Sequence, residues 1–318
     1  MGILGDDYAD DCNDEALHIV LDGNALRDII KEELKGKVAS IVEKLGYPPI
    51  ITTIRVGEDP ASERYVNMKC EMAKEVGLDP RHIHLPAGAN YDQVAREILS
   101  ANDNHMVSGI LLQVPLPPPI TFEQKEELLN MIDPRKDADG VTFQGLGKIA
   151  CKMPAFGCAT PKGIMTLLEY YGQKHGFGIA GKKALVIGRS HILGMPMALM
   201  LTAADCTVTI AHSKTRPEDL DQYLKDADIV VGAIGKTEAI DGSKIKDEAI
   251  VIDAGSNTKV VNGKKVLTGD IKMTEEDKAR WFAYTPQKGG VGPMTIITLI
   301  SQTVEAAAQK LNSPAYYN

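Results

Sequence analysis

The sequence lacks the features that mark several classes of protein. Its five cysteines include no CxxC pair and do not cluster with the seven histidines, so no metal site is expected and a reducing compartment is favoured. Aromatic residues make up only 5% of the chain, which argues against an aromatic groove for nucleic acid or carbohydrate. The formal charge of −8 also disfavours a nucleic-acid partner, because such a partner requires a basic surface.

Long apolar segments are absent as well. No run approaches the ~18 residues that cross a bilayer, so no membrane segment is predicted. The first residues, MGILGDDYADDCNDE, are acidic, whereas a transit peptide is basic and a signal peptide has an apolar centre. We therefore expect residues 1–16 to form a flexible acidic extension and the protein to be cytoplasmic.

The 318 residues are enough for two domains, and apolar strands alternate with helical segments along the chain. In the first half, the apolar strands PIITTIRVG and SGILLQVPLP are separated by charged helical stretches. In the second half, KKALVIG, TVTIAHS, ADIVVGAIG and AIVIDAGSN are continuous apolar strands, typical of a parallel sheet that is buried on both faces. The pattern predicts an α/β fold with a mostly parallel sheet in the first domain and a doubly wound, Rossmann-like second domain.

The segment VIGRSHILGMP predicts a dinucleotide site. Gly188 follows a strand and Gly194 begins a helix, so backbone N–H groups and the helix dipole would face a pyrophosphate. The glycine spacing is not GxGxxG, because Arg189 stands where the second glycine would be. The next strand ends in HSKTR, residues 212–216, without the acidic residue that holds a ribose 2′-hydroxyl. With Ser190 nearby, these groups favour NADP; an exposed basic loop is the alternative.

A second segment, YVNMK, lies in a predicted helix. Tyr65 and Lys69 are four residues apart, so they share one face of that helix. The pair is either an ordinary solvated surface or an aromatic stacking platform beside a proton carrier. Its spacing alone does not distinguish the two.

Ten motifs in order resemble those of one family. They are YVNMK, GILLQVPLP, DPRKDADGVT, ATPKG, GRSHILGMP, HSKT, GAIGK, VIDAGSN, GD at residues 269–270, and GGVGPMT. Together they resemble the bifunctional methylenetetrahydrofolate dehydrogenase/methenyltetrahydrofolate cyclohydrolase family over residues 18–312. The resemblance implies a folate domain over residues 17–158, a Rossmann domain over residues 159–294 and an active site in the cleft between them. Residues 295–318 would form a helix that packs back on the first domain.

The resemblance implies a bifunctional NADP-dependent enzyme. It would oxidise 5,10-methylenetetrahydrofolate to 5,10-methenyltetrahydrofolate and hydrolyse that product to 10-formyltetrahydrofolate for purine biosynthesis. It would form a homodimer through the Rossmann domains. The alternatives are a monofunctional methylenetetrahydrofolate dehydrogenase and a non-catalytic NADP-sensing or scaffold protein, and the presence of both half-sites disfavours them.

The resemblance also implies roles for individual residues. Lys69 would be the catalytic amine, Tyr65 would stack on the folate, Gln113 would contact Lys69 and substrate, and Asp139 would hold the pterin. The remaining folate-site residues would be Gly290, Val291 and Pro293. The predicted cofactor-binding residues are Gly188, Arg189, Ser190, Gly194, His212, Ser213, Gly235 and Asn257. Taken singly, Gln113 in an apolar strand and Asp139 before a glycine also suit purely structural roles.

Three segments depart from the usual pattern of the family. The segment CATP stands where PCTP is usual, and Ser256 replaces an aliphatic residue or threonine. Gln287 and Lys288 stand where Val-Pro is usual, close to the expected folate site. These departures bear on the shape of the pocket rather than on the chemistry.

Overall fold

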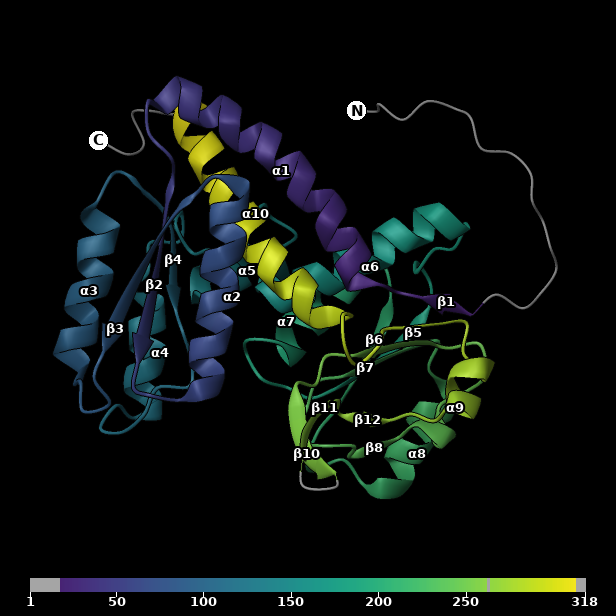
Figure 1. Cartoon of the computed structure of the whole chain (residues 1–318). Coiled ribbons are helices and arrows are strands. Elements are labelled where there is room, and N and C mark those ends of the chain that lie inside the picture. The colour runs from purple at the N-terminus through teal and green to yellow at the C-terminus, as the bar shows by residue number, and fades with distance from the viewer. Residues whose placement is uncertain (1–17, 262–263, 313–318) are drawn as a thin grey trace.

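The computed structural model describes residues 18–261 and 264–312, and the predicted acidic extension lies outside them. Figure 1 shows two α/β units connected by long helices. The main sheet of each unit is entirely parallel. The predicted two-domain α/β fold is therefore confirmed. Within the described ranges, no helix combines the length and apolarity needed to cross a membrane.

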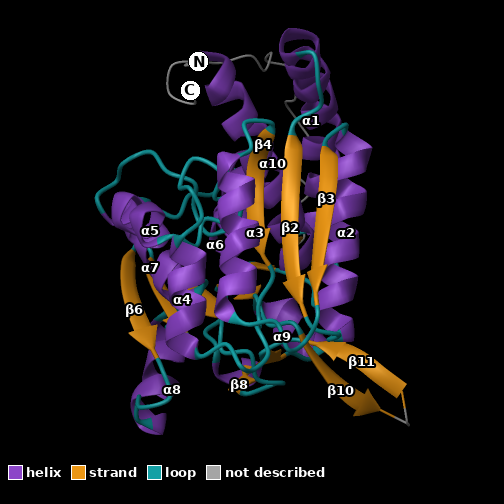
Figure 2. Ribbon diagram, turned by 90° about the vertical axis from the view of Figure 1, so that its left-hand side faces the viewer, coloured by secondary structure: helices purple, strands orange, loops and turns teal. Residues whose placement is uncertain are grey.

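The first unit is built on a three-stranded sheet in the order β3-β2-β4. The strands are β2 (Ile50–Val56), β3 (Asp79–Leu85) and β4 (Val107–Leu112), and the covering helices are α2 (Pro60–Val76), α3 (Tyr91–Asp103) and α4 (Phe122–Asn130). Every residue of β2 is buried, because helices cover both faces of the sheet, as Figures 1 and 2 show. Ile51 packs in one hydrophobic core, whereas Ile50 and Ile54 pack in another with residues of α3 and α4. Alternate side chains of one strand thus supply two cores.

Two long helices, α1 (Gly23–Leu45) and α10 (Val291–Asn312), pack together along this unit (Figure 1). α1 ends at Leu45 and is capped by Gly46, whose left-handed φ of 79° favours glycine. α10 contacts α1, α2 and β4 of the first unit and also α6 (Ala159–His175), which leads into the second unit. Because it is enclosed in this way, α10 buries twelve of its residues.

The second unit contains a six-stranded sheet in the order β1-β13-β9-β7-β5-β6. Its strands are β1 (Ile19–Val20), β5 (Lys183–Ile187), β6 (Thr207–Ala211), β7 (Ile229–Gly232), β9 (Ile250–Asp253) and β13 (Ala283–Tyr284). The chain runs from β5 to β6 on one side and then to β7 on the other. A reversal of this kind opens a crevice for ligands at the carboxyl ends of the strands.

Smaller elements complete the two units. They are α5 (Phe143–Ala150), α7 (Gly194–Ala203), α8 (Pro217–Asp226), α9 (Glu275–Arg280), the 3-10 helix η1 (Gly242–Lys244), the paired strands β8 (Ile240–Asp241) and β12 (Ile271–Lys272), and the hairpin β10 (Asn257–Val261) with β11 (Lys264–Thr268). Figure 2 shows the hairpin projecting from the second unit. The short strand β1 joins the sheet of the second unit before α1 crosses to the first unit, and the exact domain boundaries stay predictions.

Candidate active site

Lys69 on α2 and Gln113 directly after β4 form a hydrogen-bonded pair. Nζ of Lys69 donates to Oε1 of Gln113 at 3.0 Å, and the lysine is 8% exposed. Nε2 of Gln113 donates to the carbonyl of Val114 at 2.8 Å, which turns the amide oxygen toward the amine. An amide oxygen accepts a hydrogen bond from a protonated or a neutral amine, so Gln113 orients Lys69 without requiring that it be charged.

The surroundings of Lys69 disfavour its charged form. Burial lowers the pKa of Lys69 and is the largest effect, while the carboxylate of Asp139 and the thiol of Cys70 act in the opposite direction. The net shift is downward, toward the range in which an amine both accepts and returns a proton near neutral pH. The arrangement therefore suits a proton carrier better than a permanent positive charge.

Asp139 lies in a loop that two neighbouring charged residues fix in place. Lys136 is buried, and its Nζ donates to three carbonyls at the end of α3, those of Ala101, Asn102 and Asn104. The buried carboxylate of Asp137 accepts from three backbone N–H groups, those of Gly140, Val141 and Thr142. The carbonyl of Asp139 itself accepts from the N–H of Ala159 at 3.0 Å. The backbone around Asp139 is therefore rigid, and its carboxylate lies close enough to act on Lys69.

Tyr65, one turn before Lys69 on α2, reaches the second unit. Its hydroxyl lies 2.5 Å from Oγ of Ser256, in the loop between β9 and β10. Ser256 is one of the positions at which the sequence departs from the family pattern, and the sequence analysis did not foresee this contact. The bond joins the two units beside the Lys69–Gln113 pair.

Gly290, Val291 and Pro293 lie where β13 leads into α10. A Cβ at Gly290 would lie 2.5 Å from the carbonyl oxygen of Pro286, and a Cβ at Gly23 would lie 1.8 Å from the carbonyl oxygen of Gly290. The start of α1 and the start of α10 therefore pack backbone against backbone. This close packing fixes the predicted folate-site loop.

The predicted cofactor turn lies at the carboxyl ends of β5 and β7. Gly188 has a φ of 135°, and a Cβ there would lie 2.1 Å from the carbonyl oxygen of Ala233, which follows β7. A Cβ at Gly194, the first residue of α7, would lie 2.3 Å from the carbonyl oxygen of Gly188. The two glycines thus allow the turn to pack tightly, backbone against backbone, at the N-terminus of α7, and a helix N-terminus is the usual place for a pyrophosphate.

Arg189 and Ser190 are exposed on this turn, beside the residues that follow β6. Ile187 pairs with Ala211, and the N–H of Gly188 donates to the carbonyl of Ala211 at 2.9 Å. His212 and Ser213 therefore lie next to the turn. Arg216, by contrast, is held by Asp219 through contacts of 2.7 and 2.8 Å, so its guanidinium is already paired.

A buried carboxylate organises the other predicted cofactor residues, Gly235 and Asn257. Asp270 is fully buried and accepts four hydrogen bonds, from the N–H groups of Ile234, Gly235 and Lys236 and from Nδ2 of Asn257. The carboxylate of Asp253 similarly accepts from the N–H groups of Gly255, Asp270 and Ile271. Burial raises the pKa of Asp253, and these N–H groups oppose the rise. Both aspartates belong to family motifs, VIDAGSN and GD, but no role was predicted for either of them.

Comparisons with known proteins account for both units. The catalytic domain of the tetrahydrofolate dehydrogenase/cyclohydrolase family matches residues 21–139, and the NAD(P)-binding domain of the same family matches residues 158–311. The chain belongs to this family. In this tetrahydrofolate dehydrogenase/cyclohydrolase, the catalytic domain contains the Lys69–Gln113 pair and the NAD(P)-binding domain contains the glycine turns.

Individual relatives are similar to this chain over nearly its whole length. The bifunctional protein FolD of Psychrobacter sp. (strain PRwf-1) is 48% identical over 287 residues, which cover 90% of this chain and 95% of the relative. The crystal structure of the bifunctional enzyme FolD from Campylobacter jejuni has a TM-score of 0.85 at 36% identity, covering 92% of this chain and 100% of that one. The Trypanosoma brucei FolD structure, complexed with NADP cofactor and inhibitor, has a TM-score of 0.85 at 32% identity, covering 92% and 98%.

Asp270 accepts four hydrogen bonds, so replacing it tests how much this carboxylate contributes to the stability of the cofactor domain. We expect Asp270→Ala to lower the free energy of unfolding by about 3 kcal/mol or more, because four donors lose a buried acceptor. Urea denaturation measures the loss. The control is Asp241→Ala, which removes an exposed cap of a short helix and should cost about 1 kcal/mol. Equal losses in the two variants would contradict the expectation.

Proposed function

We propose that the protein oxidises 5,10-methylenetetrahydrofolate with NADP and hydrolyses the resulting 5,10-methenyltetrahydrofolate to 10-formyltetrahydrofolate. The observation that carries the proposal is the buried Lys69–Gln113 pair next to Asp139. The relatives named bifunctional FolD and the solved FolD with NADP and inhibitor support it. A monofunctional dehydrogenase would have no use for a buried, oriented amine.

The oxidation step requires little from the protein beyond positioning the substrate and the cofactor. The methylene carbon lies between two nitrogens, whose lone pairs stabilise the cation that remains when hydride leaves, so no protein base is needed. NADP, when bound, supplies the hydride acceptor. The tight glycine turn at Gly188 and Gly194 leads into the N-terminus of α7, which suits a pyrophosphate, and in the proposed binding mode Arg189, Ser190 and Ser213 hold the 2′-phosphate. Positioning of this kind contributes ~7–11 kcal/mol to a barrier.

The hydrolysis step does need a proton carrier. Water loses a proton as it attacks the methenyl carbon, and a ring nitrogen gains one as the ring opens. Lys69 is placed for both transfers, because its lowered pKa makes the neutral amine accessible and Gln113 aims it. In the proposed binding mode, the Asp139 carboxylate accepts hydrogen bonds from the 2-amino group and ring N–H of the pterin, and Tyr65 stacks on the folate. In the same proposal, Gly290, Val291 and Pro293 line the folate site.

The compartment, the oligomeric state and the pathway of the enzyme are inferred from the family resemblance. We infer a cytoplasmic homodimer, joined through its Rossmann domains, that supplies 10-formyl groups for purine biosynthesis. Sedimentation of the purified protein tests the dimer. Formation of NADPH from methylenetetrahydrofolate, followed by an assay for 10-formyltetrahydrofolate, tests the two activities. NADPH without the formyl product would indicate the monofunctional alternative, and the absence of both would indicate a non-catalytic protein.

The first variant separates the two reactions. We expect Lys69→Met to abolish hydrolysis of methenyltetrahydrofolate, because methionine keeps much of the volume of lysine but accepts no proton. Hydride transfer needs no base and should persist at a reduced rate. Parallel assays of both steps measure the split. Near wild-type hydrolysis would refute the role of Lys69 as proton carrier, and so would equal loss of both activities.

The pH profile provides an independent test of the same amine. Burial lowers the pKa of Lys69, so its neutral form is present at a lower pH than that of an exposed lysine, whose pKa is about 10.4. We expect the hydrolase rate to rise with pH and to level off below that value, whereas hydride transfer should change less. Rates are corrected for uncatalysed hydrolysis at each pH. A hydrolase rate that rises only above pH 10 would contradict the expectation.

A second variant tests the choice of cofactor. We expect Arg189→Ala to weaken NADP use about tenfold or more while changing NAD use little, because a charged hydrogen bond to phosphate contributes ~1.5–3 kcal/mol. Michaelis constants for both cofactors measure the discrimination. Arg216→Ala is the matched control, since Asp219 already holds that guanidinium. If Arg189→Ala and the wild type discriminate equally, Arg189 does not bind the phosphate.

A further inference from the structure

Gln302 on α10 is 1% exposed, yet its side-chain amide is fully hydrogen-bonded. Nε2 donates to the carbonyl oxygens of Ala138 and Gly157, at 2.8 and 3.0 Å. Oε1 accepts from the N–H of Gly157 at 2.9 Å and from Nζ of Lys162 at 3.1 Å. An amide has two N–H donors and two acceptor lone pairs, so every position is used. Such complete pairing is required of a polar group buried in a core.

The two backbone segments held by Gln302 adjoin Asp139. Ala138 directly precedes Asp139, and Gly140, which follows it, lies against Gly157. A Cβ at Gly140 would lie 2.1 Å from the carbonyl carbon and oxygen of Gly157. The position of Gly157 therefore determines where Gly140 can lie, and Gln302 fixes Gly157 through both its N–H and its carbonyl. Asp139 thus lies between Ala138, which Gln302 binds directly, and Gly140, which packs on Gly157, so Gln302 adds to the hold that Asp137 and the N–H of Ala159 have on this loop.

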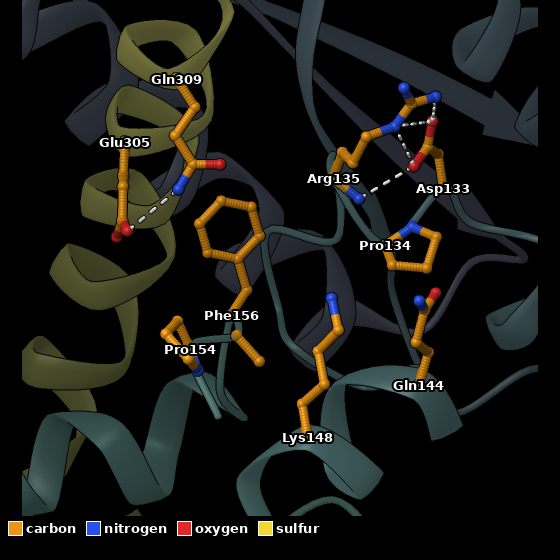
Figure 3. Close-up of a pocket in the computed structure, with 10 residues that line it drawn as sticks. Asp133, Pro134, Arg135, Gln144, Lys148, Pro154, Phe156, Glu305 and Gln309 are labelled. Atoms are coloured by element: carbon orange, nitrogen blue, oxygen red, sulfur yellow. Dashed lines mark hydrogen bonds and ion pairs between the residues drawn. The ribbon is translucent and has the colours of Figure 1, made fainter. Parts of the chain in front are cut away.

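Further along α10, a pocket of about 550 Å³ lies between the stretches of chain that precede these two segments, as Figure 3 shows. Asp133, Pro134 and Arg135 form one wall, Pro154 and Phe156 a second, and Glu305 and Gln309 of α10 a third (Figure 3). Glu305 and Gln309 follow Gln302 by three and seven residues, so all three lie on one face of the helix. Gln302 is therefore the residue of this helix face that hydrogen-bonds directly to both segments, at Ala138 and at Gly157.

We propose that Gln302 is a positioning residue for folate binding, which acts by holding the backbone on both sides of Asp139. The inference rests on the proposed role of Asp139 in binding the pterin. It assigns a part in substrate recognition to the C-terminal helix, more than 160 residues away in the chain. An apolar residue at position 302 would leave two carbonyls and one N–H buried without partners. A carboxylate would keep the acceptor but lose the two donors.

The experiment measures Michaelis constants for both folate substrates and for NADP in Gln302→Met and Gln302→Glu, with melting curves for each variant. Gln302→Met keeps the volume, and Gln302→Glu keeps the shape and the contact with Lys162, so the two variants disturb the core in different ways. The control is Ser301→Ala, because the neighbouring Ser301 hydroxyl only donates to the carbonyl of Ile297 in its own helix. We expect both Gln302 variants to raise the two folate constants about tenfold, with the NADP constant changed little. Ser301→Ala should behave as wild type.

A double variant with Asp139→Ala separates this inference from the proposed function. If Gln302 acts through Asp139, adding Gln302→Met to Asp139→Ala raises the folate constants no further. A lowered melting temperature with unchanged folate constants would make Gln302 merely structural and overturn the inference. Full additivity with Asp139→Ala would overturn it as well. If Asp139→Ala alone leaves the folate constants unchanged, the proposed role of Asp139 fails first, and this inference fails with it.

Discussion

The site depends on keeping one lysine amine out of water without giving it a permanent ionic partner. Burial penalises the charged form of Lys69, and the hydrogen bond from its Nζ goes to an uncharged amide oxygen. A carboxylate in the place of Gln113 would hold the proton on the amine. Asp139 is near enough to oppose the effect of burial, so its distance from Lys69 must be controlled. This explains why so much buried polar structure surrounds the loop that carries Asp139.

Buried aspartates build the loops that surround the site. Asp137, Asp253 and Asp270 each accept three or four hydrogen bonds, most of them from backbone N–H groups. A carboxylate surrounded by N–H groups satisfies several donors that a loop cannot pair by itself. The loops before α5 and after β7 and β9 are therefore fixed before any ligand binds. Preorganised loops place substrate groups at little further entropic cost.

Local signals in the sequence are sufficient to predict several helix ends. The glycine after α1, the Asn90 cap of α3 and the proline in the first turn of α6 each mark a helix end through its own backbone chemistry. Strand β1 escaped prediction, because two residues carry too little pattern and their partner, β13, lies more than 260 residues away. Long continuous apolar strands, by contrast, identified the parallel sheet of the second unit correctly.

The candidate site was predicted less completely. Spacing placed Tyr65 and Lys69 on one helix face, and family motifs supplied Gln113 and Asp139, whose roles stay predictions. The contacts made by Ser256, Asp270 and Gln302 were missed because their partners are either distant in the chain or backbone groups. Every residue has a backbone carbonyl, so the sequence does not reveal which carbonyl requires a side-chain donor.

The crossing helices have a consequence for synthesis on the ribosome. The core that holds Ile51 and Leu111 of the first unit also contains Met294, Ile297 and Val304 of α10. The first unit therefore remains without part of its core until the last helix has emerged, although its own sheet is complete by residue 112. Until then, the faces of α1 and α2 that receive α10 are exposed apolar surface. Folding of the two units is thus coupled in time, and a nascent chain that stops short of α10 should be a substrate for chaperones rather than a folded domain.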